Sequence, residues 1–158
     1  MKKLIKCKSI ALLGAIVMLT ACSSDESSKL TLSKLKQSDC KETSSFSKGA
    51  DLYEMLGHET ISLKAMGNDR MKIIHTNARF TCNATVDIKA SLDGSTITVA
   101  ETAPPEAKCI CPYDIEAEIG PLSATDYTIV VKSNNKTVLT KSFTYNTSLD
   151  KTFDADVK

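Results

Sequence analysis

The amino-acid sequence predicts an all-β protein, an antiparallel sandwich of six or seven short strands that follows a signal peptide and a flexible tether. After residue 58, apolar and polar residues alternate with a period of two, as they do in strands with one buried face. Turn residues interrupt this alternation at short intervals, which is typical of sandwiches. The chain has no Trp and only four Phe and four Tyr, and it is rich in Thr, Val and Ile, which favour strands.

The clearest alternation runs from Ala78 to Ala90, where even-numbered residues are apolar or Cys and odd-numbered residues are polar. We expect one strand there, with a hairpin turn at Leu92–Ser95 and a second strand over 95–101. Pro104-Pro105 ends that second strand, because proline cannot donate a hydrogen bond to a sheet.

The remaining strands are expected at 60–63, 71–76, 109–119, 127–132 and 137–145. Gly120-Pro121 stops the third of these, and Asn134-Asn135 form the tight turn between the last two. Ahead of them, Ala50–Leu56 has apolar residues at helical spacing, so we expect two helical turns there.

One segment, Ile119–Val131, resembles the corner between the fifth and sixth strands of fibronectin type III domains. In those corners a leucine, here Leu122, precedes by several residues a tyrosine, here Tyr127, that begins a strand. The resemblance implies an immunoglobulin/fibronectin III-like sandwich in which the Tyr127 hydroxyl hydrogen-bonds to nearby backbone and fixes the crossover between sheets. It implies an architecture and no activity.

The N-terminus has the order of an export signal: four lysines, a short apolar run over 10–19, and a small residue before Cys22. A run of about ten residues is too short to span a bilayer, which needs roughly 20. Leu19-Thr20-Ala21-Cys22 resembles the lipobox of bacterial lipoproteins. This resemblance implies cleavage before Cys22 and attachment of lipid, including palmitate, to its thiol.

The predicted organisation is a signal peptide over 1–21, a lipidated Cys and flexible tether over 22–45, and a sandwich domain over 46–158. Asp25 and Glu26 follow Cys22 closely and resemble the acidic export signal of Bacteroidota lipoproteins. That resemblance implies an outer-membrane, cell-surface location, and the alternative is an ordinary linker that faces the periplasm.

The charge of the mature chain argues against nucleic acid as a partner. Cleavage after residue 21 removes four of the 20 Lys and Arg and none of the 19 acids, which leaves a net charge of about −3. Affinity for nucleic acid comes largely from neutralising phosphates, which a mildly acidic domain does poorly. The expected partners are the membrane, through the lipid on Cys22, and an unknown protein or glycan.

Four cysteines remain in the predicted mature domain: Cys40, Cys82, Cys109 and Cys111. In an exported protein, disulfides are the default. A bond between Cys109 and Cys111 would close a strained ring, so each should pair with Cys40 or Cys82. Two pairings stay open, and the inward strand faces favour Cys82 with Cys111 and Cys40 with Cys109. A zinc site that adds His75 is the alternative, but its ligand spacing is unusual.

Other polar residues give no catalytic pattern. His58 lies in a predicted turn and His75 in a strand, where we expect surface or partly buried side chains rather than catalytic bases. Asp114, Glu116 and Glu118 form an acidic row that we interpret as a solvated strand face rather than a calcium site. The sequence therefore predicts no catalytic residue, no metal and no cofactor.

The run Cys109-Ile110-Cys111-Pro112-Tyr113-Asp114, with Asn77–Cys82 upstream, resembles small Bacteroidota outer-membrane lipoproteins that share a Cys-x-Cys-x-Tyr-Asp motif. The resemblance covers about residues 70–145. It implies location and fold, and it assigns no site.

These features favour a lipid-anchored binding or accessory module without catalysis, facing the cell surface or the periplasm. Its ligand would be held by the loops around Met66–Arg70, Thr102–Lys108 and Leu122–Asp126. The alternative is a proteinase inhibitor that presents a rigid loop at Ala103–Glu106, which includes Pro104 and Pro105. An enzyme is the least favoured of the three classes.

Overall fold

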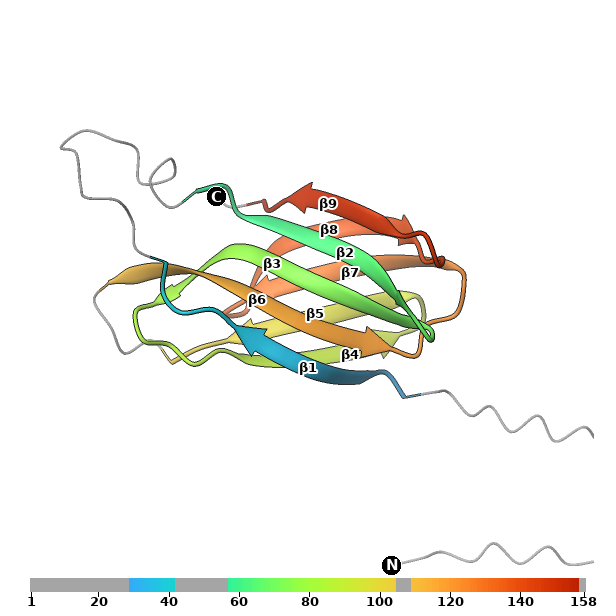
Figure 1. The fold of residues 1–158 in the computed structure, drawn as a ribbon, viewed down its shortest axis with the longest axis horizontal. Helices are drawn as coiled ribbons and strands as arrows, with labels where there is room; N and C mark the ends of the chain where they lie inside the picture. The colour runs from blue at the N-terminus through green and yellow to red at the C-terminus, as the bar shows by residue number, and fades with distance from the viewer. Residues whose placement is uncertain (1–28, 42–56, 105–108, 157–158) are drawn as a thin grey trace, which may run out of the picture.

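The computed structural model describes residues 29–41, 57–104 and 109–156, which form nine β-strands (Figure 1). The strands are β1 (Thr31–Gln37), β2 (Thr60–Gly67), β3 (Arg70–Thr81), β4 (Asp87–Asp93), β5 (Thr96–Thr102), β6 (Ile110–Gly120), β7 (Asp126–Ser133), β8 (Lys136–Thr144) and β9 (Asp150–Asp154). Within these ranges, no helix is long and apolar enough to cross a membrane. The two helical turns expected at 50–56 lie outside the described residues.

The strands form two sheets that pack face to face, which confirms the predicted all-β sandwich. One sheet has the order β1-β6-β3-β2-β9 and is antiparallel throughout, and the other has the order β4-β5-β7-β8. In the second sheet β5 and β7 run parallel, so this sheet is mixed rather than purely antiparallel. The count is also higher than the six or seven strands expected.

The core lies between the sheets and is filled by alternate residues of the strands. Its fully buried aliphatic and aromatic side chains come from both sheets: Ile61, Leu63, Met71, Phe80, Ile97, Val99, Ile119, Ile129, Val131 and Leu139. Removing such side chains from water is the main favourable term in the stability of the fold.

Strand β3 contains a bulge at Asn77, which has a left-handed backbone with φ of 57°. Before the bulge the odd-numbered Ile73 and His75 point into the core, and after it the even-numbered Ala78 and Phe80 do so. A single extra residue shifts the side-chain phase by one position. Residues 71–76 and 78–81 are therefore one strand, not parts of two.

The prediction of one strand over Ala78–Ala90 is wrong. Strand β3 ends at Thr81, the chain turns at Asn83 (φ of 60°), and β4 begins in the opposite sheet at Asp87. The alternation of apolar and polar residues continues through this turn because Phe80 and Ile88 face the same core from opposite sheets. The side-chain amide of Gln37 holds the crossover, donating to the carbonyl of Ala84 (2.7 Å) and accepting from the N–H of Val86 (2.9 Å).

Both ends of the described chain contribute edge strands that the sequence did not predict. Strand β1 lies within 22–45, the range expected to be tether, and pairs with β6 from Thr31 opposite Gly120 onward. The folded domain therefore begins earlier than residue 46. At the other end β9 pairs with β2 and covers its outer edge.

The corner between β6 and β7 has the expected geometry. Leu122 and Tyr127 are both buried, and the Tyr127 hydroxyl accepts a hydrogen bond from the backbone N–H of Ser123 (3.2 Å). This contact lies where the chain leaves one sheet and enters the other.

Two disulfides join Cys40 to Cys111 and Cys82 to Cys109, with Cα–Cα distances of 5.5 Å in each. The pairing favoured by the sequence is thus wrong, although Cys109 and Cys111 are not joined to each other. Cys109 precedes β6 and is exposed, so it meets Cys82 in the turn after β3, while the buried Cys111 meets the incoming Cys40. One bond fastens the end of β1 and the other fastens the turn that leads to β4.

We expect the Cys40→Ala/Cys111→Ala pair of substitutions to destabilise the domain more than Cys82→Ala/Cys109→Ala. The two bonds span 71 and 27 residues of sequence. Each should contribute about 2–4 kcal/mol, with more from the longer loop, since closing it removes more entropy from the unfolded chain. Denaturant unfolding of both variants measures the difference. Peptide mapping under non-reducing conditions that joins Cys82 to Cys111 would contradict this pairing.

Candidate functional site

The loops that the sequence singled out for binding lie at opposite ends of the sandwich. The turns at Met66–Arg70 and Leu122–Asp126 meet at the end where β1 begins, through a hydrogen bond from Leu122 N–H to Asp69 C=O (2.8 Å). Residues 102–104 lie at the other end, beside the β7–β8 turn, where Ala103 N–H donates to the side chain of Asn134 (2.9 Å). Residues 102–104 of the third loop therefore share no surface with the other two turns.

A buried cluster of charged side chains lies near this second end. His75 on β3 lies between two carboxylates: its Nδ1 is 2.7 Å from Glu101 Oε2, and its Nε2 is 2.8 Å from Glu59 Oε1. Glu59 directly precedes β2, whereas Glu101 belongs to β5 of the opposite sheet. The three side chains are only 1–3% exposed. The imidazole therefore bridges the two sheets through the core.

The two carboxylates determine the protonation of His75. Burial alone would lower the pKa of the imidazole, but the hydrogen bonds to Glu101 and Glu59 and their negative charges outweigh burial and raise it from 6.5 to about 9. At neutral pH both ring nitrogens carry protons and each donates to a carboxylate. One cation then lies between two anions, which leaves one negative charge to be balanced.

Arg79 supplies the balancing charge. It lies four residues after His75 on β3, and its Nε is 3.7 Å from Glu59 Oε2. Its Nη2 also donates to the backbone carbonyl of Gly57 at 3.5 Å. The four side chains Glu101, His75, Glu59 and Arg79 thus form a neutral chain of alternating charge that runs from the core to the surface.

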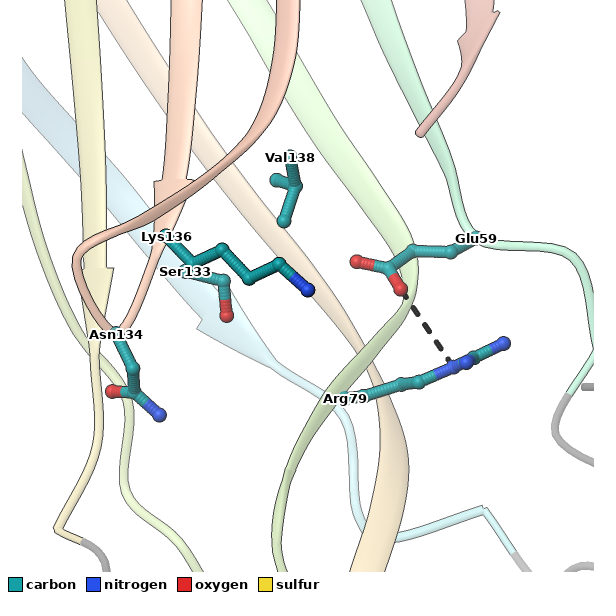
Figure 2. Close-up of a pocket in the computed structure, with 6 residues that line it drawn as sticks. All are labelled: Glu59, Arg79, Ser133, Asn134, Lys136 and Val138. Carbon is teal, nitrogen blue, oxygen red and sulfur yellow. Dashed lines mark ion pairs between the residues drawn. The ribbon is translucent and has the colours of Figure 1, made fainter. Parts of the chain in front are cut away.

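A pocket of about 320 Å³ opens at the outer end of this chain (Figure 2). Glu59, Arg79, Ser133, Asn134, Lys136 and Val138 line it. Figure 2 shows the ammonium group of Lys136 and the carboxylate of Glu59 pointing toward each other. The volume lies at the lower end of the range for small-molecule sites.

The arrangement suits binding better than catalysis. His75 is 1% exposed and both its nitrogens already face carboxylates, so it offers no lone pair to a substrate. A general base must reach the proton that it removes, which this burial prevents. The pocket, by contrast, is open and has charged, hydroxyl, amide and apolar groups on its walls.

The sequence predicts that the acidic row on β6 is a solvated strand face. In the structure each of its carboxylates lies beside a cation. Asp114 pairs with Lys41, and Glu116 pairs with Lys72 at 3.1 Å. Glu118 is only 4% exposed and lies beside Lys34 and Arg70. Because β6 lies between β1 and β3, cations from the flanking segments reach each carboxylate.

The other residues that the sequence singled out lie apart from the pocket or outside the residues that the structure describes. All four cysteines are in disulfides and His75 faces carboxylates, which rules out the zinc alternative. Within the described ranges, no group of His, Cys, Asp and Glu is arranged to hold a metal ion. His58 is exposed. Cys22, Asp25, Glu26 and Pro105 lie outside the described residues.

The buried cluster of His75, Glu59 and Glu101 is the feature of the candidate site that the sequence did not predict. His75 shares the inward phase of Met71 and Ile73, and Glu101 shares that of Ile97 and Val99. A charged residue at an inward strand position needs a partner, since an unpaired buried charge is costly. That mismatch was visible in the sequence, but the identity of the partners depends on the sheet order.

The chain matches no family model, no curated protein and no solved structure. Its function therefore has to be inferred from the geometry of the site.

We predict that the free energy of unfolding falls as the pH rises from about 6.5 to 9. His75 has a higher pKa in the folded chain than in the unfolded chain, so its stabilising effect is complete below 6.5 and is lost as the pH passes through 9. The loss should be about 3 kcal/mol, which follows from the difference between the two pKa values. Urea unfolding at pH 6, 7.5 and 9 measures it.

Two variants separate this effect from general alkaline destabilisation. Glu101→Gln keeps a hydrogen-bond acceptor but removes a charge, so the loss should shift to lower pH. His58→Gln changes an exposed histidine and should leave the profile as it was. A stability that stays flat between pH 6 and 9 in the unsubstituted protein would show that His75 is neutral.

Proposed function

We propose that this protein is a lipid-anchored binding module that is held on a membrane through Cys22 and binds a small ligand in the pocket beside Glu59 and Arg79. The observation that carries the proposal is the position of this pocket. It lies at the end of the sandwich opposite the one where β1 begins.

The tether end is defined by the register of β1. Thr31 lies opposite Gly120, the last residue of β6, and its hydroxyl donates to the Gly120 carbonyl at 2.8 Å. Thr31 follows Cys22 by nine positions in the sequence, and an extended chain of that length reaches at most about 32 Å. A lipid on Cys22 would therefore keep this end of the domain close to the membrane.

The pocket end is separated from the tether end by the length of the strands. Strand β6 has 11 residues, which corresponds to about 35 Å. Arg79 lies near the far end of β3, and Ser133, Asn134 and Lys136 form the β7–β8 turn at the same end. A ligand arriving from outside would meet the pocket before it met the membrane.

The anchor is tested by Cys22→Ala. We expect this variant to lose incorporation of a fatty-acid analogue and to leave the membrane fraction, because the lipid is the proposed attachment. Undiminished label in Cys22→Ala would reject the lipid anchor.

The export signal is tested in the same cells by Asp25→Ala/Glu26→Ala. If the acidic signal directs the protein to the surface, this variant should keep the fatty-acid label but lose cleavage by protease added to whole cells.

Binding is tested by applying the full chain, purified in detergent, to glycan arrays and to pull-downs from envelope extracts. We expect a specific glycan or partner whose capture is weakened by Lys136→Gln, which alters the pocket, and unaffected by Lys141→Gln. Lys141 is the matched control because it is an exposed lysine on the same strand that does not line the pocket. A hydrolytic activity without any captured ligand would overturn the binding module.

A proteinase inhibitor is the second candidate, since the described base of the 103–106 loop is firmly held. Pro104 C=O accepts a hydrogen bond from the Thr81 hydroxyl (3.0 Å), and the Cys82–Cys109 disulfide fastens the other side of the loop. A loop whose base is held loses less entropy on binding a protease than one with a free base. Inhibition of cysteine or serine proteases by the same preparation would favour this candidate over the pocket.

A further inference from the structure

We propose that a second copy of this chain pairs with the free edge of β4, so that two antiparallel β4 strands join the four-stranded sheets of two molecules across a two-fold axis at Ser91. This contact involves neither the pocket nor its ligand. Two features carry it: the protection that the other edge strands have against pairing, and the order of charged and apolar residues along β4.

Among the described strands, three of the four that lie at a sheet edge carry a feature that opposes a further strand. On β8, the exposed Lys141 lies opposite the buried Ile129 and therefore has the phase of the core. On β9, the exposed Lys151 lies opposite the buried Leu63 in the same way. A neighbouring strand would bury these charges, which disfavours pairing. On β1, the left-handed Lys34 (φ of 51°) and a bulge interrupt the edge.

Strand β4 has no such protection. Its register with β5 continues over its whole length without a bulge, and none of its residues has a left-handed backbone. Its inward residues are apolar: Ile88 is buried, Ala90 packs against the core, and Leu92 lies opposite the buried Ile97. Leu92 is nevertheless 36% exposed. Within the described chain β5 is the one strand that pairs with β4, so no strand covers Leu92 from the outside.

The backbone groups of Ile88, Ala90 and Leu92 point toward the free edge, which lies beside β1 along the lower border of the sandwich in Figure 1. In β5, the C=O of Glu101 accepts the N–H of Asn134 (2.8 Å) on the side away from β4. Backbone groups alternate sides along a strand, so the even-numbered residues of β5 face β4. Their partners in β4 are the odd-numbered residues. The even-numbered residues of β4 therefore offer their N–H and C=O groups to another strand.

The sequence of β4 is complementary to itself in one antiparallel register. When Ser91 lies opposite Ser91 of the second copy, each Lys89 faces Asp93 of the other copy on the outer face of the sheet. Opposite charges at facing positions of neighbouring strands stabilise the pair. On the inner face, Ala90 lies opposite Leu92 of the other copy, and their backbones exchange two hydrogen bonds. The exposed Leu92 side chain is thereby covered.

The neighbouring registers bring like charges together. With Ala90 opposite its own copy, Asp87 faces Asp93, and with Lys89 opposite its own copy, two ammonium groups meet. Registers that are shifted further leave shorter overlaps. Lys89 already lies 3.5 Å from Asp87 of its own strand, but its side chain is 82% exposed and can reach a second carboxylate. Charge therefore selects the register that is centred on Ser91.

The proposed axis lies near the end of the sandwich at which β1 begins. The β4–β5 turn is at this end, because the C=O of Ser95 accepts the N–H of Thr128 at the start of β7 (2.9 Å). Both tethers would therefore leave the dimer near its middle, and the two pockets would lie toward its far ends. This arrangement is compatible with two chains that are anchored in the same membrane.

The experiment introduces a cysteine at the axis by Ser91→Cys in the full chain, purified in detergent, and follows linked dimer on non-reducing gels during air oxidation. Covalent capture is used because one strand of seven residues provides a small interface. Facing residues that share no hydrogen bonds have Cα atoms about 4.5 Å apart, and disulfides join Cα atoms about 4.4–6.8 Å apart. Peptide mapping should join position 91 of the two chains and leave Cys40–Cys111 and Cys82–Cys109 intact.

Thr140→Cys is the matched control. Thr140 is exposed on the outer face of β8, which is the other edge strand of the same sheet. Linked dimer should form about tenfold faster or more in Ser91→Cys than in Thr140→Cys, because pairing raises the effective concentration of the two thiols. Equal rates of linkage in the two variants would overturn the proposal.

Three further changes in the Ser91→Cys chain test the register. Lys89→Asp should abolish the linked dimer because it opposes carboxylates, and Lys89→Asp/Asp93→Lys should restore it. Leu92→Lys gives β4 the inward lysine that β8 and β9 have, and it should abolish the dimer as well. Thermal melting of each variant checks that the fold is intact. A dimer that persists in Lys89→Asp, or one that folded Lys89→Asp/Asp93→Lys does not recover, would contradict β4 pairing.

Discussion

The hydrogen bonds of one imidazole hold the two layers of this protein in register. The His75 imidazole donates to Glu59, which precedes a strand of its own sheet, and to Glu101 on the opposite sheet. The two layers are therefore joined by charged hydrogen bonds as well as by apolar contact. A buried ion cluster is not a large source of net stability, since desolvation offsets much of the attraction. The cluster raises the free energy of other packings of the two sheets, because any shift of one sheet would leave a buried carboxylate without its partner.

The pocket depends on the same cluster. Glu59 is the residue that belongs to both, as it accepts from His75 inside and pairs with Arg79 outside. The β7–β8 turn closes the pocket from the other sheet. Glu59 is therefore held in position on the pocket side by its contacts with His75 and Arg79, and a preordered side chain loses less entropy when a ligand binds. The two disulfides lie at the same end of the sandwich, where they fasten the segments that follow β1 and β3.

The sequence predicts the positions of strands where apolar and polar residues alternate cleanly. It does not predict which strands, distant in the sequence, pair with one another. Strands β5, β7 and β8 were predicted because Gly94 and Asn134 mark their turns. Strand β1 was missed because the left-handed Lys34 and a bulge interrupt its pattern, and β9 was missed because Phe153 is its one apolar residue. The disulfide pairing and the partners of His75 depend on which strands become neighbours, and local periodicity carries no information about that.

The parallel pairing of β5 with β7 has a consequence for how the chain acquires its structure. Parallel neighbours cannot be joined by a hairpin, and here the connection passes through β6 in the other sheet. Neither sheet can therefore assemble alone, and β1 must wait for a partner 89 residues away at Gly120. Such topologies fold slowly and as a single unit. We expect a nascent chain to stay unstructured, and open to proteases and chaperones, until nearly all of it has been synthesised.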